Sequence, residues 1–190
     1  MTHPHQHLIA FVGLSGSGKT TAAQYVKQHD VPVVYFGDII RQAMERESVE
    51  PTWENQQEFR EAIRRREGND FVASRAIKQI QNLLDAGQHK IILDSLYTWT
   101  EYKLLKHAFP GELIVIAVVS PKHLRIQRMG KRPIRPLTPD QVTQRDWAEI
   151  ENLEKGGPIA IADHYIYNDA GINKLYTQLD AVLRETSFLS

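Results

Sequence analysis

Short apolar segments recur along the chain, and longer stretches with a helical spacing of apolar residues separate them. Segments of this length without polar interruption are typical of strands that are buried on both faces of a parallel sheet. The runs lie at residues 8–12, 33–36, 91–93, 113–119 and, with more polar character, 165–167. The pattern predicts a parallel sheet built from these five segments.

The stretches between these runs predict helices. In residues 70–87 apolar side chains recur every few positions, and Gly87 is a candidate C-terminal cap. Thr138, followed by Pro139, marks the start of a later helix. Because alternating strands and helices are the signature of a doubly wound α/β domain, we expect one such domain across residues 1–190, with helices on both faces of the sheet.

Two segments interrupt the simple alternation. Residues 38–88 have room for three helices, which we expect to begin near Asp38, Thr52 and Asn69. Residues 130–138 ("GKRPIRPLT") are basic and rich in proline. Insertions of this kind are where binding sites and lids lie in such domains. We therefore expect an acceptor-binding insertion at 38–88 and a short lid at 130–138.

Composition excludes several functions. Lys plus Arg and Asp plus Glu number 23 each, so no global basic field favours nucleic acid or a membrane surface as a partner. The chain has no cysteine, which removes thiol catalysis and thiolate metal sites. No apolar run approaches the roughly 18 residues of a membrane span, and the start of the chain lacks a secretory signal. We expect a cytoplasmic protein, a monomer or a homodimer, whose histidine-rich residues 1–7 form a tail rather than a metal site.

One contiguous motif carries the most specific chemistry. Residues 13–20 ("GLSGSGKT") match G-x-x-x-x-G-K-[ST] at every fixed position, after an apolar run and before a helical pattern. Glycines let successive backbone N–H groups face phosphate oxygens, and the positive end of the following helix lies at the same place. The motif predicts a nucleoside triphosphate site. The residues expected to bind ATP are Gly13, Ser15, Gly16, Ser17, Gly18, Lys19, Thr20 and Thr21.

Two further positions extend this site. Lys19 can reach the β- and γ-phosphates, and the Thr20 hydroxyl can bind Mg²⁺. Asp94 ends the run "KIILD", so its carboxylate is expected at the carboxyl edge of the sheet, where α/β sites lie. We expect Asp94 to hold Mg²⁺ through water or to orient an acceptor.

A second substrate is indicated by "FGDIIR", in which Asp38 precedes Arg41 by one helical turn. The loop, "FGDIIR" and "IILDS" together resemble the nucleoside-monophosphate-kinase group of P-loop proteins. A closer resemblance, over most of the chain, is to small archaeal-type kinases that are adenylate-kinase-like or dephospho-CoA-kinase-like. It rests on "EPTWEN", "IRRREGNDFVASRAI", "SPKHLRIQRMGKR", "QRDWAEIE" and "AIADHYIYND".

The resemblance implies roles for several basic residues. Arg41 and Arg64 would approach the acceptor, while Arg128, Arg132 and Arg145 would border the lid. Arg125, Arg128, Arg132 and Arg135 form a basic cluster of the kind that neutralises charge on a transferring phosphoryl group, although a solvated helix face explains some of them equally well. The resemblance thus implies Mg²⁺-dependent transfer of the γ-phosphoryl group of ATP. The expected catalytic residues are Lys19, Asp38, Asp94, Arg128 and Arg132.

The departures from the resemblance concern the acceptor. Adenylate kinases carry an arginine shortly after the aspartate that ends this strand, whereas residues 94–98 read "DSLYT". Because a bidentate phosphate clamp is missing there, adenylate kinase proper is not expected. The dense arginines of "REAIRRR" favour an anionic, nucleotide-like acceptor, for which Asp38, Arg41, Arg64 and Arg145 are the expected contacts.

Two alternatives stay open. If the acceptor is a hydroxyl, as in dephospho-CoA kinases, Asp38 would take its proton. A nucleotide-dependent switch with slow hydrolysis would need the loop and Asp94 but no acceptor pocket. The insertion at 38–88 argues against the switch.

Overall fold

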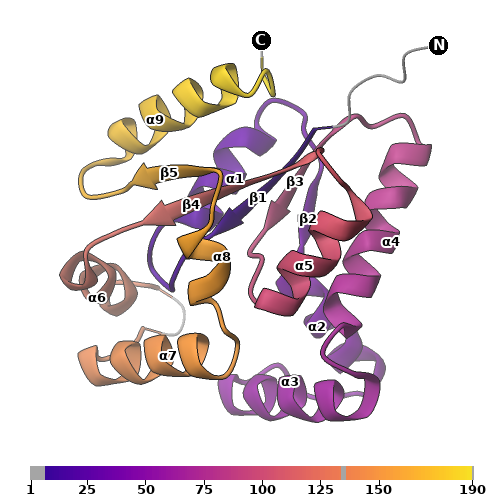
Figure 1. The fold of residues 1–190 in the computed structure, drawn as a ribbon. Helices are drawn as coiled ribbons and strands as arrows, with labels where there is room; N and C mark the ends of the chain where they lie inside the picture. The colour runs from indigo at the N-terminus through magenta and orange to yellow at the C-terminus, as the bar shows by residue number, and fades with distance from the viewer. Residues whose placement is uncertain (1–6, 134–135, 190) are drawn as a thin grey trace.

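The computed structural model describes residues 7–133 and 136–189 and contains a parallel sheet of five strands, in the order β2-β3-β1-β4-β5 (Figure 1). The expected strands are therefore confirmed, and their ends differ from the predicted ends by no more than one residue. The strands are β1 (His7–Val12), β2 (Val33–Tyr35), β3 (Lys90–Asp94), β4 (Leu113–Val119) and β5 (His164–Tyr167).

Helices connect the strands and cover the sheet. They are α1 (Lys19–Lys27), α2 (Phe36–Arg46), α3 (Trp53–Glu67), α4 (Phe71–Asp85), α5 (Trp99–Ala108), α6 (Lys122–Gly130), α7 (Pro139–Glu151), α8 (Gly156–Ala160) and α9 (Ile172–Glu185). The three helices expected between the second and third strands are α2, α3 and α4. None of the helices in the described residues is long and apolar enough to cross a membrane.

Alternate residues of the central strand face two separate cores. Leu8 and Ala10 of β1 pack with residues of α2, α4 and α5 on one face of the sheet. Ile9 and Phe11 pack with residues of α1 and α9 on the other face. These strand residues are all fully buried, which explains why the strands read as continuous apolar runs rather than as alternating ones.

Local interactions explain where α7 begins, and the end of β2 sets the start of α2. The Thr138 hydroxyl accepts a hydrogen bond from the Gln141 amide, and the Gln141 side chain accepts one from the Thr138 amide, as the sequence at α7 predicts. Helix α2 begins two residues earlier than expected, since β2 runs directly into it. Asp38 therefore lies in the first turn of α2 instead of capping it. Its negative charge there interacts favourably with the positive end of the helix dipole.

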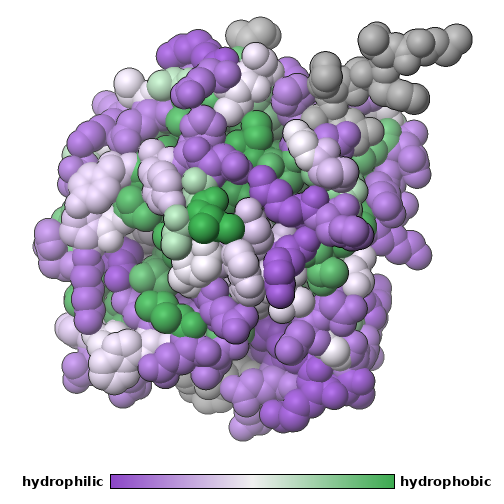
Figure 2. Space-filling model, viewed as in Figure 1, coloured by the Kyte–Doolittle hydropathy of each residue, from purple (hydrophilic) through white to green (hydrophobic). Residues whose placement is uncertain are grey.

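The topology gathers the polar motifs at one edge of the sheet. β1 lies between β3 and β4, and Phe11 pairs in register with Asp94. The glycine-rich loop after β1 and the end of β3 are therefore neighbours. Helices α3 and α7 lie at this same end of the molecule (Figure 1), and hydrophilic side chains cover α3 in the space-filling view (Figure 2). The histidine-rich tail expected at residues 1–7 falls, except for His7, outside the described residues.

Candidate functional site

The loop at 13–18 has a backbone that only glycine satisfies at key positions. Gly18 is the N-cap of α1 with φ +105°, and a Cβ there would lie 2.3 Å from Nδ2 of Asn168. That amide donates a hydrogen bond of 2.7 Å to the Ser17 carbonyl, so the loop is held against the end of β5. Gly13 is equally restricted, because a Cβ would meet the Val118 carbonyl at 2.3 Å. The loop is thus a preformed cradle in front of the N-terminus of α1.

Lys19 begins α1 and is almost completely buried. Burial, together with the nearby Lys155 ammonium, lowers the pKa of Lys19 to about 7, while the carboxylates of Glu149 and Asp94 act in the opposite direction. A buried cation with so little compensation binds a polyanion favourably, because the ligand supplies the missing negative charge. This property, with the cradle and the α1 N-terminus, fits a triphosphate.

Asp94 ends β3 beside the loop and is also buried. The Ser95 hydroxyl donates a hydrogen bond of 2.9 Å to it, and the Thr20 side chain is a further hydrogen-bond partner. Burial raises the pKa of Asp94, and Ser95, Lys19 and Thr20 partly offset that rise. The described residues contain no group of three or more metal-ligating side chains. One hydroxyl and one carboxylate fit Mg²⁺, which typically takes few protein ligands and completes its shell with phosphates and water.

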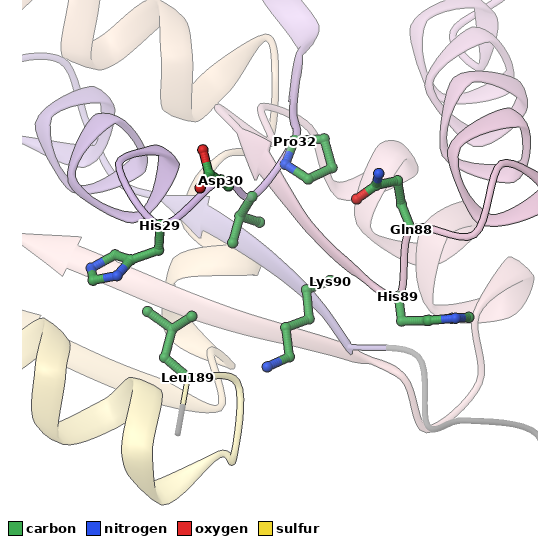
Figure 3. A pocket seen from close by; sticks show the side chains of 8 residues that line it. His29, Asp30, Pro32, Gln88, His89, Lys90 and Leu189 are labelled. Atoms are coloured by element: carbon green, nitrogen blue, oxygen red, sulfur yellow. The ribbon is translucent and has the colours of Figure 1, made fainter.

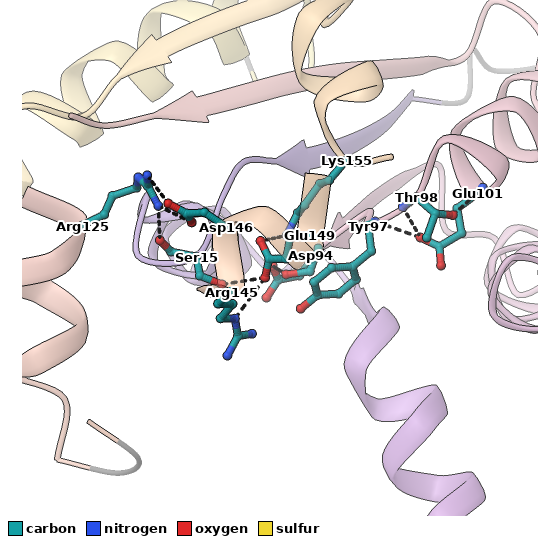
Figure 4. A network of polar contacts seen from close by, with 11 residues as sticks. Ser15, Asp94, Tyr97, Thr98, Glu101, Arg125, Arg145, Asp146, Glu149 and Lys155 are labelled. Carbon is teal, nitrogen blue, oxygen red and sulfur yellow. Dashed lines mark hydrogen bonds and ion pairs between the residues drawn. The ribbon is translucent and has the colours of Figure 1, made fainter. Parts of the chain in front are cut away.

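Helices α6 and α7 hold the loop from the other side (Figure 4). The two terminal guanidinium nitrogens of the buried Arg125 donate hydrogen bonds to Asp146, at 2.7 and 2.8 Å, and Nη1 also donates to the Ser15 carbonyl at 3.2 Å. Arg125, expected in a basic cluster with Arg128, Arg132 and Arg135, is therefore engaged in an internal ion pair instead. Its role is to fix the loop relative to α6 and α7.

This ion pair carries a stability prediction. Arg125→Met should lower the free energy of unfolding by about 3 kcal/mol, because it leaves the Asp146 carboxylate buried without its partner. Replacing both residues, as in Arg125→Met with Asp146→Leu, should recover most of the loss. Urea denaturation followed by circular dichroism measures both effects. Equal loss in the single and double variants would show that the pair does not account for the effect.

A second network reaches the loop through Ser15 (Figure 4). The buried Glu149 of α7 accepts hydrogen bonds from Ser15 Oγ (2.8 Å), Arg145 Nε (3.1 Å) and Lys155 Nζ (2.8 Å). Burial acts to raise the pKa of Glu149, but Lys155 and Arg145 outweigh burial and lower that pKa to about 2. Lys155 is fully buried, with its ammonium 4.4 Å from the centre of the Tyr97 ring. Neither Glu149 nor Lys155 was predicted from the sequence as a site residue.

The lid residues named from the sequence separate in the structure. Arg128 turns toward the end of β5, where it donates to Ser120 Oγ at 2.7 Å and to the carbonyl and side-chain oxygens of Asn168 at 3.2 Å. Arg132 lies exposed after α6. Arg135 is outside the described residues. Arg128 is thus connected to the loop through Asn168, and Arg145, expected at the lid, instead joins the Glu149 network.

Three arginines gather between α3 and α7. Arg60 and Arg64 lie one turn apart on α3, and Arg64 is largely buried. Burial lowers the pKa of Arg60, and the positive charges of Arg145 and Arg64 lower it further. Glu149 offsets part of this repulsion, and a further anion among the three guanidinium groups would offset more of it. The cluster of Arg60, Arg64 and Arg145, here called the arginine cluster, is therefore a candidate anion site next to Glu149.

Asp38 and Arg41 lie one helical turn apart on α2, as the sequence predicts, and form an ion pair of 3.1 Å. Both side chains are about half exposed, at 48% and 54%. Each neutralises the other in this arrangement, so an acceptor would have to open the pair in order to bind Arg41. Arg64 of the arginine cluster is more buried than Arg41.

A cavity of about 340 Å³ lies at the opposite edge of the sheet, among His29, Asp30, Pro32, His89 and Lys90 (Figure 3). These residues precede β2 and surround the start of β3, whereas the phosphate cradle lies at the carboxyl ends of the strands. Because α/β sites form at the carboxyl ends, this cavity is not part of the candidate site.

Solved structures with the same architecture identify the class of fold. Shikimate kinase from Bacteroides thetaiotaomicron superposes with a TM-score of 0.60 at 11% identity, covering 95% of this chain and 98% of that one. A gluconokinase from Sinorhizobium meliloti gives a TM-score of 0.55 at 14% identity, covering 98% of each chain. With its loop and strand order, the protein has the fold of the small P-loop kinases.

Sequence comparisons identify the family. A family described as an AAA domain matches residues 12–147. The UPF0200 protein of Thermococcus onnurineus is 31% identical over 165 residues, which cover 85% of this chain and 88% of that protein. The UPF0200 protein of Sulfurisphaera tokodaii is 31% identical over 180 residues, covering 93% and 96%. The chain belongs to the UPF0200 family, and the expected resemblance to archaeal-type P-loop kinases is confirmed.

Proposed function

We propose that this protein is a phosphotransferase that moves the γ-phosphoryl group of Mg²⁺-bound ATP to a small, anionic, nucleotide-like acceptor. The observation that supports an acceptor, beyond nucleotide binding, is the arginine cluster. Arg145 belongs to this cluster and also bonds Glu149, which in turn bonds Ser15 of the loop. The cationic region on α3 and the triphosphate cradle are therefore connected through one carboxylate.

Charge distinguishes the cluster from a structural ion-pair network. Arg60, Arg64 and Arg145 face the site together with Lys19 and Lys155. The buried carboxylates nearby are Glu149, Glu101 and Asp94, and burial raises the pKa of the last two. The surplus positive charge suits two anionic ligands, a triphosphate in the loop and a second anion on α3 and α7.

The chain's residues then divide the work of an in-line transfer. Bound Mg²⁺ would neutralise charge on the β- and γ-phosphates, with Thr20 and Asp94 at its site. The loop amides and Lys19 orient the γ-phosphate, while the arginine cluster holds the acceptor's anion. Catalysis consists of positioning and charge neutralisation, since a phosphate acceptor is already ionised and needs no base. Arg128 on α6 and Arg132 just after α6 would border the nucleotide.

Transfer to a hydroxyl is the second candidate. The neighbours in fold are named for shikimate and gluconate, which are carboxylates that carry hydroxyl groups. Such acceptors would use the same arginine cluster for the carboxylate, and Asp38 would serve as the base once its pair with Arg41 opens. A nucleotide-dependent switch does not account for the arginine cluster.

An acceptor screen by coupled ADP release tests the proposal. The wild-type protein is incubated with Mg²⁺ and ATP, and nucleoside monophosphates, dephospho-CoA and hydroxy acids are added one at a time. We expect ADP release to rise well above the basal rate with one class of acceptor, since chemistry requires both anions in place. A basal rate that stays constant with every acceptor, in a protein that binds ATP, would favour the switch.

Asp94→Asn should lower ATP turnover about 100-fold and raise the Mg²⁺ concentration needed for half-maximal rate, because the carboxylate at the end of β3 becomes neutral. The amide keeps the shape of the side chain and can still accept from Ser95. Asp85→Asn, at the exposed end of α4, is the matched control and should leave both quantities unchanged. An unaltered Mg²⁺ dependence in Asp94→Asn would remove Asp94 from the metal site.

A further inference from the structure

Glu101 carries a carboxylate oxygen that its local structural role does not use. It is the third residue of α5 and completes a capping box with Thr98. One of its oxygens, Oε2, accepts hydrogen bonds from the amides of Tyr97 (2.8 Å) and Thr98 (3.0 Å) (Figure 4). The other, Oε1, is buried and has no hydrogen-bond partner among the described residues. A glutamine would cap this helix as well, so the second oxygen and the charge exceed what the cap requires.

The unused oxygen faces Arg64. The Nη2 atom of Arg64 lies 3.9 Å from Oε1, too far for a hydrogen bond but within range of an ion pair, and the two side chains are 15% and 1% exposed. Keeping a carboxylate charged in such a buried place is costly, and burial raises the pKa of Glu101 accordingly. The cations that offset this cost are Arg64 on α3 and Lys155 on the loop before α8.

Arg64 is subject to opposing forces. Arg60 on the preceding turn repels it, since Arg60 and Arg64 are close enough for the charge of one to act on the other. Glu101 attracts it from the side of α5. An arginine side chain has several rotatable bonds, and the fixed carboxylate of Glu101 favours the conformation in which the Arg64 guanidinium stays against α5.

We propose that Glu101 is a positioning residue of the acceptor site, which holds the Arg64 guanidinium against α5 so that its free N–H groups face the acceptor's anion. The inference rests on the proposed function and adds a residue outside both α3 and the phosphate loop. Each carboxylate oxygen of Glu101 then has its own role. Oε2 caps α5, and Oε1 orients the Arg64 guanidinium.

Two variants separate these tasks. Glu101→Gln keeps an oxygen for the amides of Tyr97 and Thr98 but removes the charge that faces Arg64. Thr98→Ala removes the other half of the capping box, the hydroxyl that accepts from the Glu101 amide at 3.0 Å, and leaves the carboxylate in place. The first variant should affect anion binding, and the second should affect the stability of α5.

The experiment uses inorganic phosphate as the probe of the acceptor site. The phosphate loop is saturated with Mg²⁺ and the non-hydrolysable analogue AMP-PNP, and phosphate is titrated while arginine side-chain signals are followed by NMR. Glu101→Gln should weaken phosphate binding about tenfold and leave AMP-PNP affinity unchanged. Thr98→Ala should lower the thermal midpoint without changing phosphate affinity.

The possible failures are distinguishable. If wild type binds phosphate at Arg64 and Glu101→Gln binds it equally well, Glu101 does not position Arg64 and the inference is overturned. If Thr98→Ala weakens phosphate as much as Glu101→Gln does, the effect belongs to the cap and the inference is again overturned. If wild type shows no response of the arginine signals with AMP-PNP bound, the anionic acceptor site itself is wrong, and the proposed function fails with it.

Discussion

Lys19→Ala should reduce kcat/KM for ATP about 10³-fold, equal to about 4 kcal/mol of transition-state stabilisation. Lys19 is buried at the start of α1 beside the glycine-rich cradle. In the transition state negative charge is spread over the oxygens of the transferring group and builds on the departing ADP, so a fixed cation in a site with little water contributes far more than it would on the surface. Steady-state ADP release at saturating acceptor measures the loss.

Lys78→Ala is the matched control for this prediction. Lys78 lies exposed on α4, so its removal changes the net charge equally but leaves the cradle intact. Its kcat/KM should stay within about twofold of wild type, because surface charges contribute little. Similar losses in both variants, or full activity in Lys19→Ala, would contradict the assignment of the triphosphate site.

Arg64→Ala should lower kcat/KM for the acceptor on the order of 10³-fold while changing the Kd for Mg²⁺-bound ATP little. The side chain is 15% exposed, lies beside Glu101 and belongs to the arginine cluster rather than to the phosphate loop. The substitution removes a charged hydrogen-bond donor to the acceptor's anionic group. The site is partly buried, and a charge-assisted hydrogen bond is stronger there than at the surface. Acceptor-dependent ADP release and calorimetry with ATP separate the two effects.

The neighbouring Arg65 provides the control on the same helix. Its side chain is 72% exposed and pairs with Glu61 at the surface. Arg65→Ala changes the charge and helix content of α3 in the same way, yet it should leave acceptor use nearly unchanged. An equal effect of both substitutions would mean that α3 acts through its overall charge and that Arg64 has no specific contact.

The parts of the site that lie within one contiguous segment could be predicted from the sequence. The loop at 13–20 is a local motif whose glycines are required by its own backbone, and Asp94 follows from its place at the end of an apolar run. The five strands and the three helices between β2 and β3 were predictable for the same reason, since burial on both faces leaves a signal in each segment.

The parts that depend on distant pairings could not be predicted. Ser15 and Glu149 are 134 residues apart, and nothing near Lys155 in "NLEKGG" distinguishes a buried lysine from a solvated one. The helical spacing of Arg125 and Arg128 suggested a shared basic face, whereas Asp146 takes one of them and Asn168 the other. Arg125 and Arg128 are the same residue type on the same helix, so the sequence does not distinguish them. Tertiary packing decides which internal partner each of them meets.

Calorimetric titration of the wild-type protein with ATP in the presence of Mg²⁺ measures whether the glycine-rich loop binds a nucleoside triphosphate. We expect saturable binding of one ATP per chain, which Lys19→Ala weakens and Lys78→Ala leaves intact. No heat of association with either ATP or GTP, in a protein shown to be folded, would mean that the loop is not a triphosphate site.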